Sequence, residues 1–139
     1  MPADDRPALP APDLPSLVAV AVGGAVGALV RTALEDRLPA DPGTWPWTTF
    51  AVNLAGAFVL AFVATQVQVG LAPARRRLLV GTGFCGALTT FSTLELELLR
   101  MLDADRVGLA VLYAVASVGL GLSLALGASR LVRRGVAAR

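Results

Sequence analysis

The stretch Gly81-Thr82-Gly83-Phe84-Cys85-Gly86-Ala87-Leu88-Thr89-Thr90-Phe91-Ser92-Thr93 decides how this chain folds. It lies in a run from Leu78 to Leu94 that carries no charge and is nearly long enough to cross a bilayer. Three glycines and five hydroxyl residues weaken the helix and place polar groups at membrane depth. Broken backbone is tolerated there only where protein packs around it or where it lines a polar cavity. The stretch therefore predicts a membrane helix that breaks in its middle.

Two interpretations of this break compete. Small residues let membrane helices approach closely, so a packing seam would account for the three glycines. A seam does not account for five hydroxyl residues clustered around Phe91, whereas a break that serves an ion accounts for both features. We therefore favour the ion. The single cysteine, Cys85, lies inside the apolar run, where a thiol is usually an inert small hydrophobe.

The composition places the chain among membrane proteins. Of its 139 residues 55% are hydrophobic, the mean hydropathy is +0.68, and the length leaves room for one domain only. The absence of histidine excludes imidazole base catalysis and metal sites built on histidine. Glu95 and Glu97 are two residues apart, hence on different helix faces, and we expect both to be solvated. An enzyme is not indicated.

Uncharged segments separated by short polar loops predict an all-α membrane protein with four transmembrane helices. A proline-rich tail over residues 1–13 is expected to be disordered, and residues 133–139 form a basic tail. Trp45 and Trp47 precede the second helix as an aromatic belt would. The helices are expected at about residues 14–34, 47–69, 74–101 and 107–132, and together they form one channel domain over residues 14–132.

The distribution of the arginines predicts an orientation in the membrane, because the chain contains no lysine. With four spans, the two termini and the middle loop share one side, which carries eight arginines against three or four on the other. By the positive-inside rule both termini should be cytoplasmic. The arginines are spread over loops and ends, so no nucleic-acid partner is predicted. The eight are Arg6, Arg75, Arg76, Arg77, Arg130, Arg133, Arg134 and Arg139.

Single polar residues within the helices leave alternatives open. Asn53 either bonds to a neighbouring helix or lines a pore, and both interpretations are equally supported. Arg31 stands at a helix end, where an arginine most often snorkels to the interface and less often lines a vestibule. Tyr113, Ser117 and Gly121 are spaced by four and therefore share one face of the last helix.

Three stretches together resemble one family, the bacterial fluoride channels called Fluc or CrcB. The third stretch is long enough to be diagnostic, and the resemblance extends over all four helices. The stretches are Gly23-Gly24-x-x-Gly27-Ala28-x-x-Arg31, Thr49-x-x-x-Asn53-x-x-Gly56-x-Phe58, and Gly83-Phe84-Cys85-Gly86-x-x-Thr89-Thr90-Phe91-Ser92-Thr93 followed by Glu97.

The resemblance implies an antiparallel, dual-topology dimer with two fluoride pores in the plasma membrane of a bacterial cell. It implies a structural sodium ion at the dimer centre, bound by backbone carbonyls at the positions of Gly86 and Thr89. It also implies a passive channel that exports fluoride from the cytoplasm and so relieves fluoride toxicity. The implied pore residues are Asn53, Phe91, Ser92, Thr93, Tyr113, Ser117 and Arg31.

The residue types suit that chemistry. Fluoride is small and strongly hydrated, so a selective path must replace its water with hydrogen-bond donors, which amides and hydroxyls supply. The edge of a phenyl ring carries partial positive charge and can face an anion. A central cation lowers the cost of placing an anion nearby, and carbonyls freed by a helix break suit a hard cation.

Two features depart from the family pattern. The family block usually has a second phenylalanine three residues after the first, and this chain has Leu94 there. The arginine bias is the second departure, because a chain that inserts in both orientations should carry balanced counts. Both departures favour one half of a heterodimer with a paralogous chain over a homodimer.

Two rivals come from other classes. A small drug/proton antiporter needs a carboxylate within its first helix, and residues 14–30 contain none. A non-transporting assembly protein would use the small residues for packing only, and it predicts no anion flux. Removing Asn53 or Phe91 would then have no cost to transport.

Overall fold

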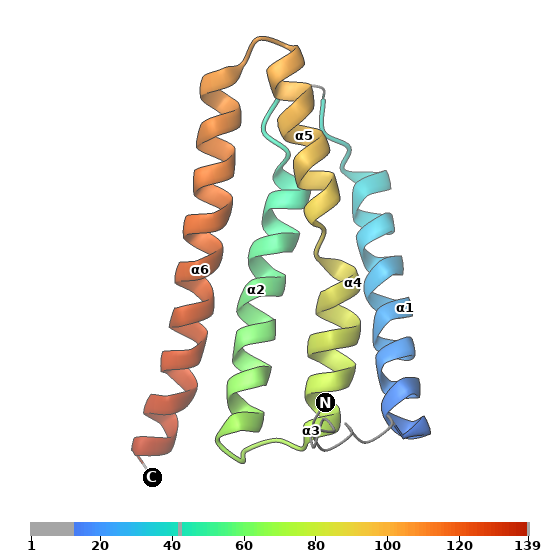
Figure 1. The fold of residues 1–139 in the computed structure, drawn as a ribbon, viewed down its shortest axis with the longest axis vertical. Coiled ribbons are helices and arrows are strands. Elements are labelled where there is room, and N and C mark those ends of the chain that lie inside the picture. Colours follow the sequence, from blue (N-terminus) through green and yellow to red (C-terminus); the bar gives the residue numbers. More distant parts are fainter. Residues whose placement is uncertain (1–12, 42, 139) are drawn as a thin grey trace, which may run out of the picture.

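The computed structural model describes residues 13–41 and 43–138, and every regular element in these ranges is a helix. Three helices are long and apolar enough to cross a membrane: α1 (Leu14–Arg37), α2 (Trp47–Gln68) and α6 (Val107–Ala137). Between α2 and α6 the chain forms one more helical rod, the third in sequence order, which is interrupted. Figure 1 shows the four rods side by side. The interrupted rod consists of α3 (Ala74–Arg76), η1 (Arg77–Cys85), α4 (Gly86–Leu88) and α5 (Phe91–Asp103).

The observed helix limits differ from the expected ones mainly at the basic ends. The helix α1 continues to Arg37, and α6 continues to Ala137, five residues beyond the expected end at 132. Arginine is a good helix former and is favourable in a last turn, so the arginines near the end of α6 extend it. Residues 133–137 of the expected basic tail therefore belong to α6 and do not form a separate segment. The proline-rich tail over residues 1–12 lies outside the described residues.

The helix break is where the glycine- and hydroxyl-rich stretch predicts it, and the segment before it is a nine-residue π-helix, η1. This segment packs backbone against backbone on α1. A Cβ atom added at Gly23 would collide with the Leu79 carbonyl oxygen, and one at Gly27 with the Phe84 carbonyl oxygen. On the other side, a Cβ at Gly83 would lie 2.6 Å from the Val20 carbonyl oxygen. The expected close packing is confirmed, so the chain has both a seam and a break.

Substituting Gly23 by alanine tests this seam. The new methyl group must push α1 away from η1, and overpacking of this kind costs about 1–3 kcal/mol. Gly24→Ala is the matched control, because its Cβ would meet its nearest neighbour, the Gly83 carbonyl oxygen, at 3.9 Å. We expect the melting temperature of the purified protein in detergent to fall for Gly23→Ala and to hold for Gly24→Ala. Equal melting temperatures would contradict the seam.

The helix α6 packs along α2, and a small aromatic core closes the end of the bundle near the start of α6. Met101, Ala110 and Tyr113 are buried there. Trp45 contacts the Tyr113 ring edge-on, with centroids 5.2 Å apart, and so packs against this core. Trp47 remains 69% exposed.

Candidate functional site

The break consists of two extended residues between α4 and α5. Thr89 has ψ 150°, and Thr90 has φ −143° and ψ 123°, so neither continues the helix. The Thr90 hydroxyl accepts a hydrogen bond from the Thr93 N–H at 3.1 Å, which caps the first turn of α5. Threonine is a favoured residue at this capping position. The sequence thus encodes both the end of one helix and the start of the next.

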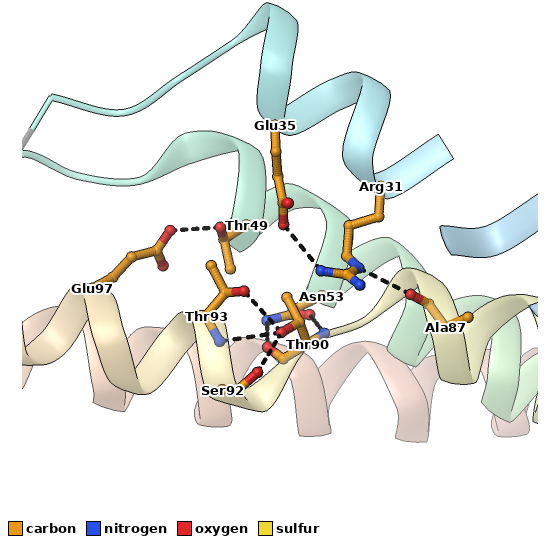
Figure 2. A network of polar contacts seen from close by, with 9 residues as sticks. All are labelled: Arg31, Glu35, Thr49, Asn53, Ala87, Thr90, Ser92, Thr93 and Glu97. Atoms are coloured by element: carbon orange, nitrogen blue, oxygen red, sulfur yellow. Dashed lines mark hydrogen bonds and ion pairs between the residues drawn. The ribbon is translucent and has the colours of Figure 1, made fainter. Parts of the chain in front are cut away.

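Asn53 of α2 holds the break in place. Its Nδ2 donates to the Thr90 carbonyl oxygen at 3.0 Å, and the Thr90 N–H donates to its Oδ1 at 2.9 Å (Figure 2). One side chain therefore satisfies both backbone polar groups of Thr90, which have no helical partner at the break. In a continuous helix the Thr90 N–H would bond to the Gly86 carbonyl. Because Asn53 takes this N–H, the Gly86 carbonyl loses its helical donor.

Arg31 of α1 turns toward the break and does not simply reach for the interface. Its Nε donates to the Ala87 carbonyl oxygen at 3.1 Å, so the guanidinium caps the last turn of α4. An Nη atom lies 3.5 Å from a carboxylate oxygen of Glu35, one turn further along α1. Figure 2 shows the arginine between these two partners. Arg31 thus ties α1 to the C-terminal end of α4.

Hydroxyl groups line the start of α5. The Thr90 Oγ1 lies 3.3 Å from Ser92 Oγ and donates to Thr93 Oγ1 at 2.9 Å. The Thr89 hydroxyl donates to the Cys85 carbonyl oxygen at 2.9 Å, within its own rod. Phe91 is the first residue of α5, and its side chain is 72% exposed. The break therefore presents hydroxyl groups next to an exposed phenyl ring.

Two hollows adjoin the break. The first, of about 290 Å³, is lined by Asn53, Thr90, Phe91 and Leu94 among others. Gly56 also lines it and packs against Thr89, whose methyl group a Cβ atom at Gly56 would collide with. The second hollow, of about 240 Å³, has a more charged lining. Its polar lining residues are Glu35, Thr48, Thr49, Thr93, Glu97 and Arg100.

Glu97 is buried, and the expectation that it lies on a solvated face is wrong. Its side chain accepts a hydrogen bond from the Thr49 hydroxyl at 2.6 Å and another from the Tyr113 hydroxyl at 2.7 Å. A carboxylate can be buried only if donors of this kind compensate its lost hydration. Glu95, two residues earlier, is exposed. Spacing alone could not show which glutamate faces the bundle, because both donors come from other helices.

Tyr113→Phe tests the Glu97 cluster. The substitution keeps the ring but leaves one carboxylate oxygen without its donor, which costs about 1–3 kcal/mol. We expect a lower melting temperature for Tyr113→Phe, and a double-mutant cycle with Glu97→Gln should show coupling between the two sites. Additive effects of the two substitutions would contradict the hydrogen bond.

The structure brings together most, but not all, of the predicted site residues. Tyr113 is fully buried and donates to Glu97, so it does not join the hydroxyl groups at the break. The Ser117 hydroxyl is buried one turn further along α6 and has no hydrogen-bond partner within the described part of the chain. The residues that gather at the break are Arg31, Asn53, Gly86, Thr89, Phe91, Ser92 and Thr93.

Comparison with known proteins identifies the family to which this chain belongs. The family model described as CrcB-like protein, Camphor Resistance (CrcB), matches residues 18–128. The chain is 46% identical over 127 residues to the fluoride-specific ion channel FluC 1 of Mycobacterium bovis, which covers 91% of this chain and 96% of the relative. It is 43% identical over 112 residues to the fluoride-specific ion channel FluC of Methanopyrus kandleri, covering 80% and 84%. The chain therefore belongs to the CrcB family, whose members are multi-pass membrane ion channels and not enzymes.

Proposed function

We propose that this chain forms a passive, fluoride-selective channel that exports fluoride from the cytoplasm and so relieves its toxicity. The observation that carries the proposal is the break at Thr89 and Thr90, fixed by the two hydrogen bonds of Asn53. A membrane protein retains such a break only where it serves packing or a polar path. The relatives named as fluoride-specific channels supply the identity of the ion.

The donors beside the break match the needs of a small anion. The hydroxyl groups of Ser92 and Thr93 lie next to the exposed ring of Phe91, whose edge can face an anion. In the proposed channel Ser117 of α6 contributes a further hydroxyl group, Tyr113 acts through its hydrogen bond to Glu97, and Arg31 fixes the end of α4. No energy source is required, because the ion moves down its own electrochemical gradient.

A structural sodium ion fits the backbone carbonyl oxygens that the break leaves without a hydrogen-bond partner. The Gly86 carbonyl lacks its helical partner, and carbonyl oxygens are suitable ligands for a hard cation. Within the described residues no group of three or more His, Cys, Asp or Glu side chains could bind a metal, so a site made of backbone oxygens fits this composition. We propose that the carbonyls of Gly86 and Thr89 bind the sodium, which lowers the cost of an anion nearby.

An antiparallel dimer of four-span subunits would complete the site. Phe91 exposes 72% of its surface beside the break, where the first hollow opens outward. A second subunit in the opposite orientation would cover this face and bring two breaks together at the centre. The interrupted rod from α3 to α5 would then be the fourth span, and α6 of one subunit would approach the break of the other.

The alternative is a subunit that conducts poorly until it pairs with an oppositely oriented paralogue. Leu94 stands in place of the second family phenylalanine, and its side chain packs against the Met101–Tyr113 core while it also lines the first hollow. The bias of eight arginines to one side favours a single insertion orientation. Both features support a heterodimer.

Efflux from liposomes tests the proposal and its alternative together. Purified chain is reconstituted into vesicles loaded with fluoride or chloride, and efflux is recorded with ion-selective electrodes after a potassium ionophore removes the opposing potential. We expect fluoride efflux and no chloride efflux. Flux from the chain alone would exclude an obligate heterodimer. Flux only after co-reconstitution with an oppositely biased paralogue would establish the heterodimer, and no flux in either case would overturn the channel proposal.

A further inference from the structure

A groove near the end of the bundle where α1 begins combines an apolar floor with two arginines at one end. It lies between the start of α1 and the α3–η1 segment and has a volume of about 440 Å³. Among residues 13–41 and 43–138, the charged residues that line it are Arg75 and Arg76 of α3, and both are exposed. Its apolar lining consists of Pro15, Val18, Ala19, Val22 and Leu79.

The direction of this groove relates it to the membrane. Pro15, Val18 and Val22 follow one another at helical spacing along one face of α1, so the groove runs parallel to the helix axis. At 1.5 Å per residue this row is about 10 Å long, which is roughly the length of eight methylene groups. Arg75 and Arg76 lie at the end of the bundle where α1 begins, and Figure 1 places α3 beside this end.

We propose that the groove binds one anionic phospholipid, with its phosphate at Arg75 and Arg76 and an acyl chain along α1. Charge complementarity identifies the occupant, because an apolar channel capped by two guanidinium groups matches a single acyl chain capped by a phosphate. Val18 and Val22 are 51% and 52% exposed, so the apolar wall is open to a lipid tail. The proposal rests on the multi-pass membrane placement of the chain and not on fluoride conduction.

One described carboxylate competes for this site. Asp13 lies 3.6 Å from an Nη atom of Arg75, and both side chains are more than half exposed. An ion pair this exposed contributes little free energy, so a phosphate anchored by its acyl chain displaces the carboxylate. Removing the competitor with Asp13→Asn should therefore increase lipid binding.

Native mass spectrometry of the purified protein tests the proposal with 1-palmitoyl-2-oleoyl phosphatidylglycerol, and with the matching phosphatidylcholine as the neutral control. We expect one phosphatidylglycerol retained per subunit and no phosphatidylcholine. The charge variant is Arg75→Gln with Arg76→Gln, and each arginine near an anionic headgroup is expected to contribute about fivefold in affinity. The pair should therefore lower lipid affinity about thirtyfold. The matched control is Arg133→Gln with Arg134→Gln, which removes the same charge from exposed positions near the end of α6.

A second variant tests the apolar floor independently of charge. Ala19→Phe fills the groove and should abolish retention while Arg75 and Arg76 remain; Val18→Trp serves if Ala19→Phe does not fold. If both double arginine variants lose lipid affinity equally, lipid binding depends on general surface charge and the proposed site is overturned. Full retention in Ala19→Phe or Val18→Trp would exclude the acyl chain from the groove. Loss of dimers in the Arg75 and Arg76 variant would overturn the proposal by showing that a second copy of the chain occupies the groove.

Discussion

Replacing Asn53 by alanine is expected to abolish fluoride efflux and to destabilise the protein together. The substitution orphans both the N–H and the carbonyl of Thr90, because Asn53 is the partner of each. Each unpaired group costs about 1–3 kcal/mol when it is removed from water. The break can then rearrange toward a continuous helix in which the Thr90 N–H bonds to Gly86 again. Efflux from liposomes and the melting temperature in detergent measure the two effects on the same preparation.

Asn53→Asp tests whether the amide donor of this residue is required, because it changes only the NH2 group to an oxygen. Aspartate keeps an acceptor for the Thr90 N–H, loses the donor to the Thr90 carbonyl, and adds a negative charge that repels an anion. We expect it to melt below the wild type, because one carboxylate oxygen faces the Thr90 carbonyl oxygen without a proton between them, and to conduct no fluoride. Gln68→Ala is the matched control, because it removes an amide from the exposed end of the same helix. Normal flux in Asn53→Ala would show that conduction does not depend on the fixed break.

The break was predictable because its causes are local. Glycine and threonine lower helix stability wherever they stand, so a dense group of them in an uncharged run marks the position of the break from composition alone. The first residues of α2 and α6 could be predicted equally well, since polar loops precede both helices. The π-helical form of η1 was not predictable. It accompanies the close approach of the η1 backbone to Gly23 and Gly27, which depends on a segment more than fifty residues away.

The partners of the polar side chains were the least predictable feature of the site. Helical spacing shows which residues share a face, but not what that face meets. Asn53 could have bonded to any neighbouring helix, and its pairing with Thr90 joins residues 37 positions apart. For the same reason Glu97 was assigned to solvent, although the hydroxyl groups of Thr49 and Tyr113 enclose it. The one local feature that could have indicated a buried Glu97 is its position shortly after the threonine-rich break.

The role of Arg31 has two physical explanations with different consequences. The guanidinium is a positive charge near the donors that a fluoride path would use, so it can attract the anion. It is also the cap of α4, with Nε on the Ala87 carbonyl and a neighbouring Nη beside Glu35. Glu35 offsets much of its charge at 3.5 Å, which weakens attraction and leaves the cap intact. The geometry therefore favours a positioning role.

Substituting Arg31 by lysine distinguishes these explanations, because lysine keeps the charge and loses the planar, directed N–H groups. We expect Arg31→Lys and Arg31→Met to lower fluoride efflux to a similar extent, each by about tenfold or more, since a hydrogen bond to a charged group contributes about 1.5–3 kcal/mol. Glu35→Gln serves as the charge control: it removes the offsetting carboxylate, leaves the bond to Ala87 and should change efflux little. The salt dependence decides between the two roles, because steering by a charge weakens as ionic strength rises, whereas a directed hydrogen bond from the half-buried guanidinium responds far less. If Arg31→Lys conducts like the wild type while Arg31→Met does not, the charge acts on the ion and the cap is incidental.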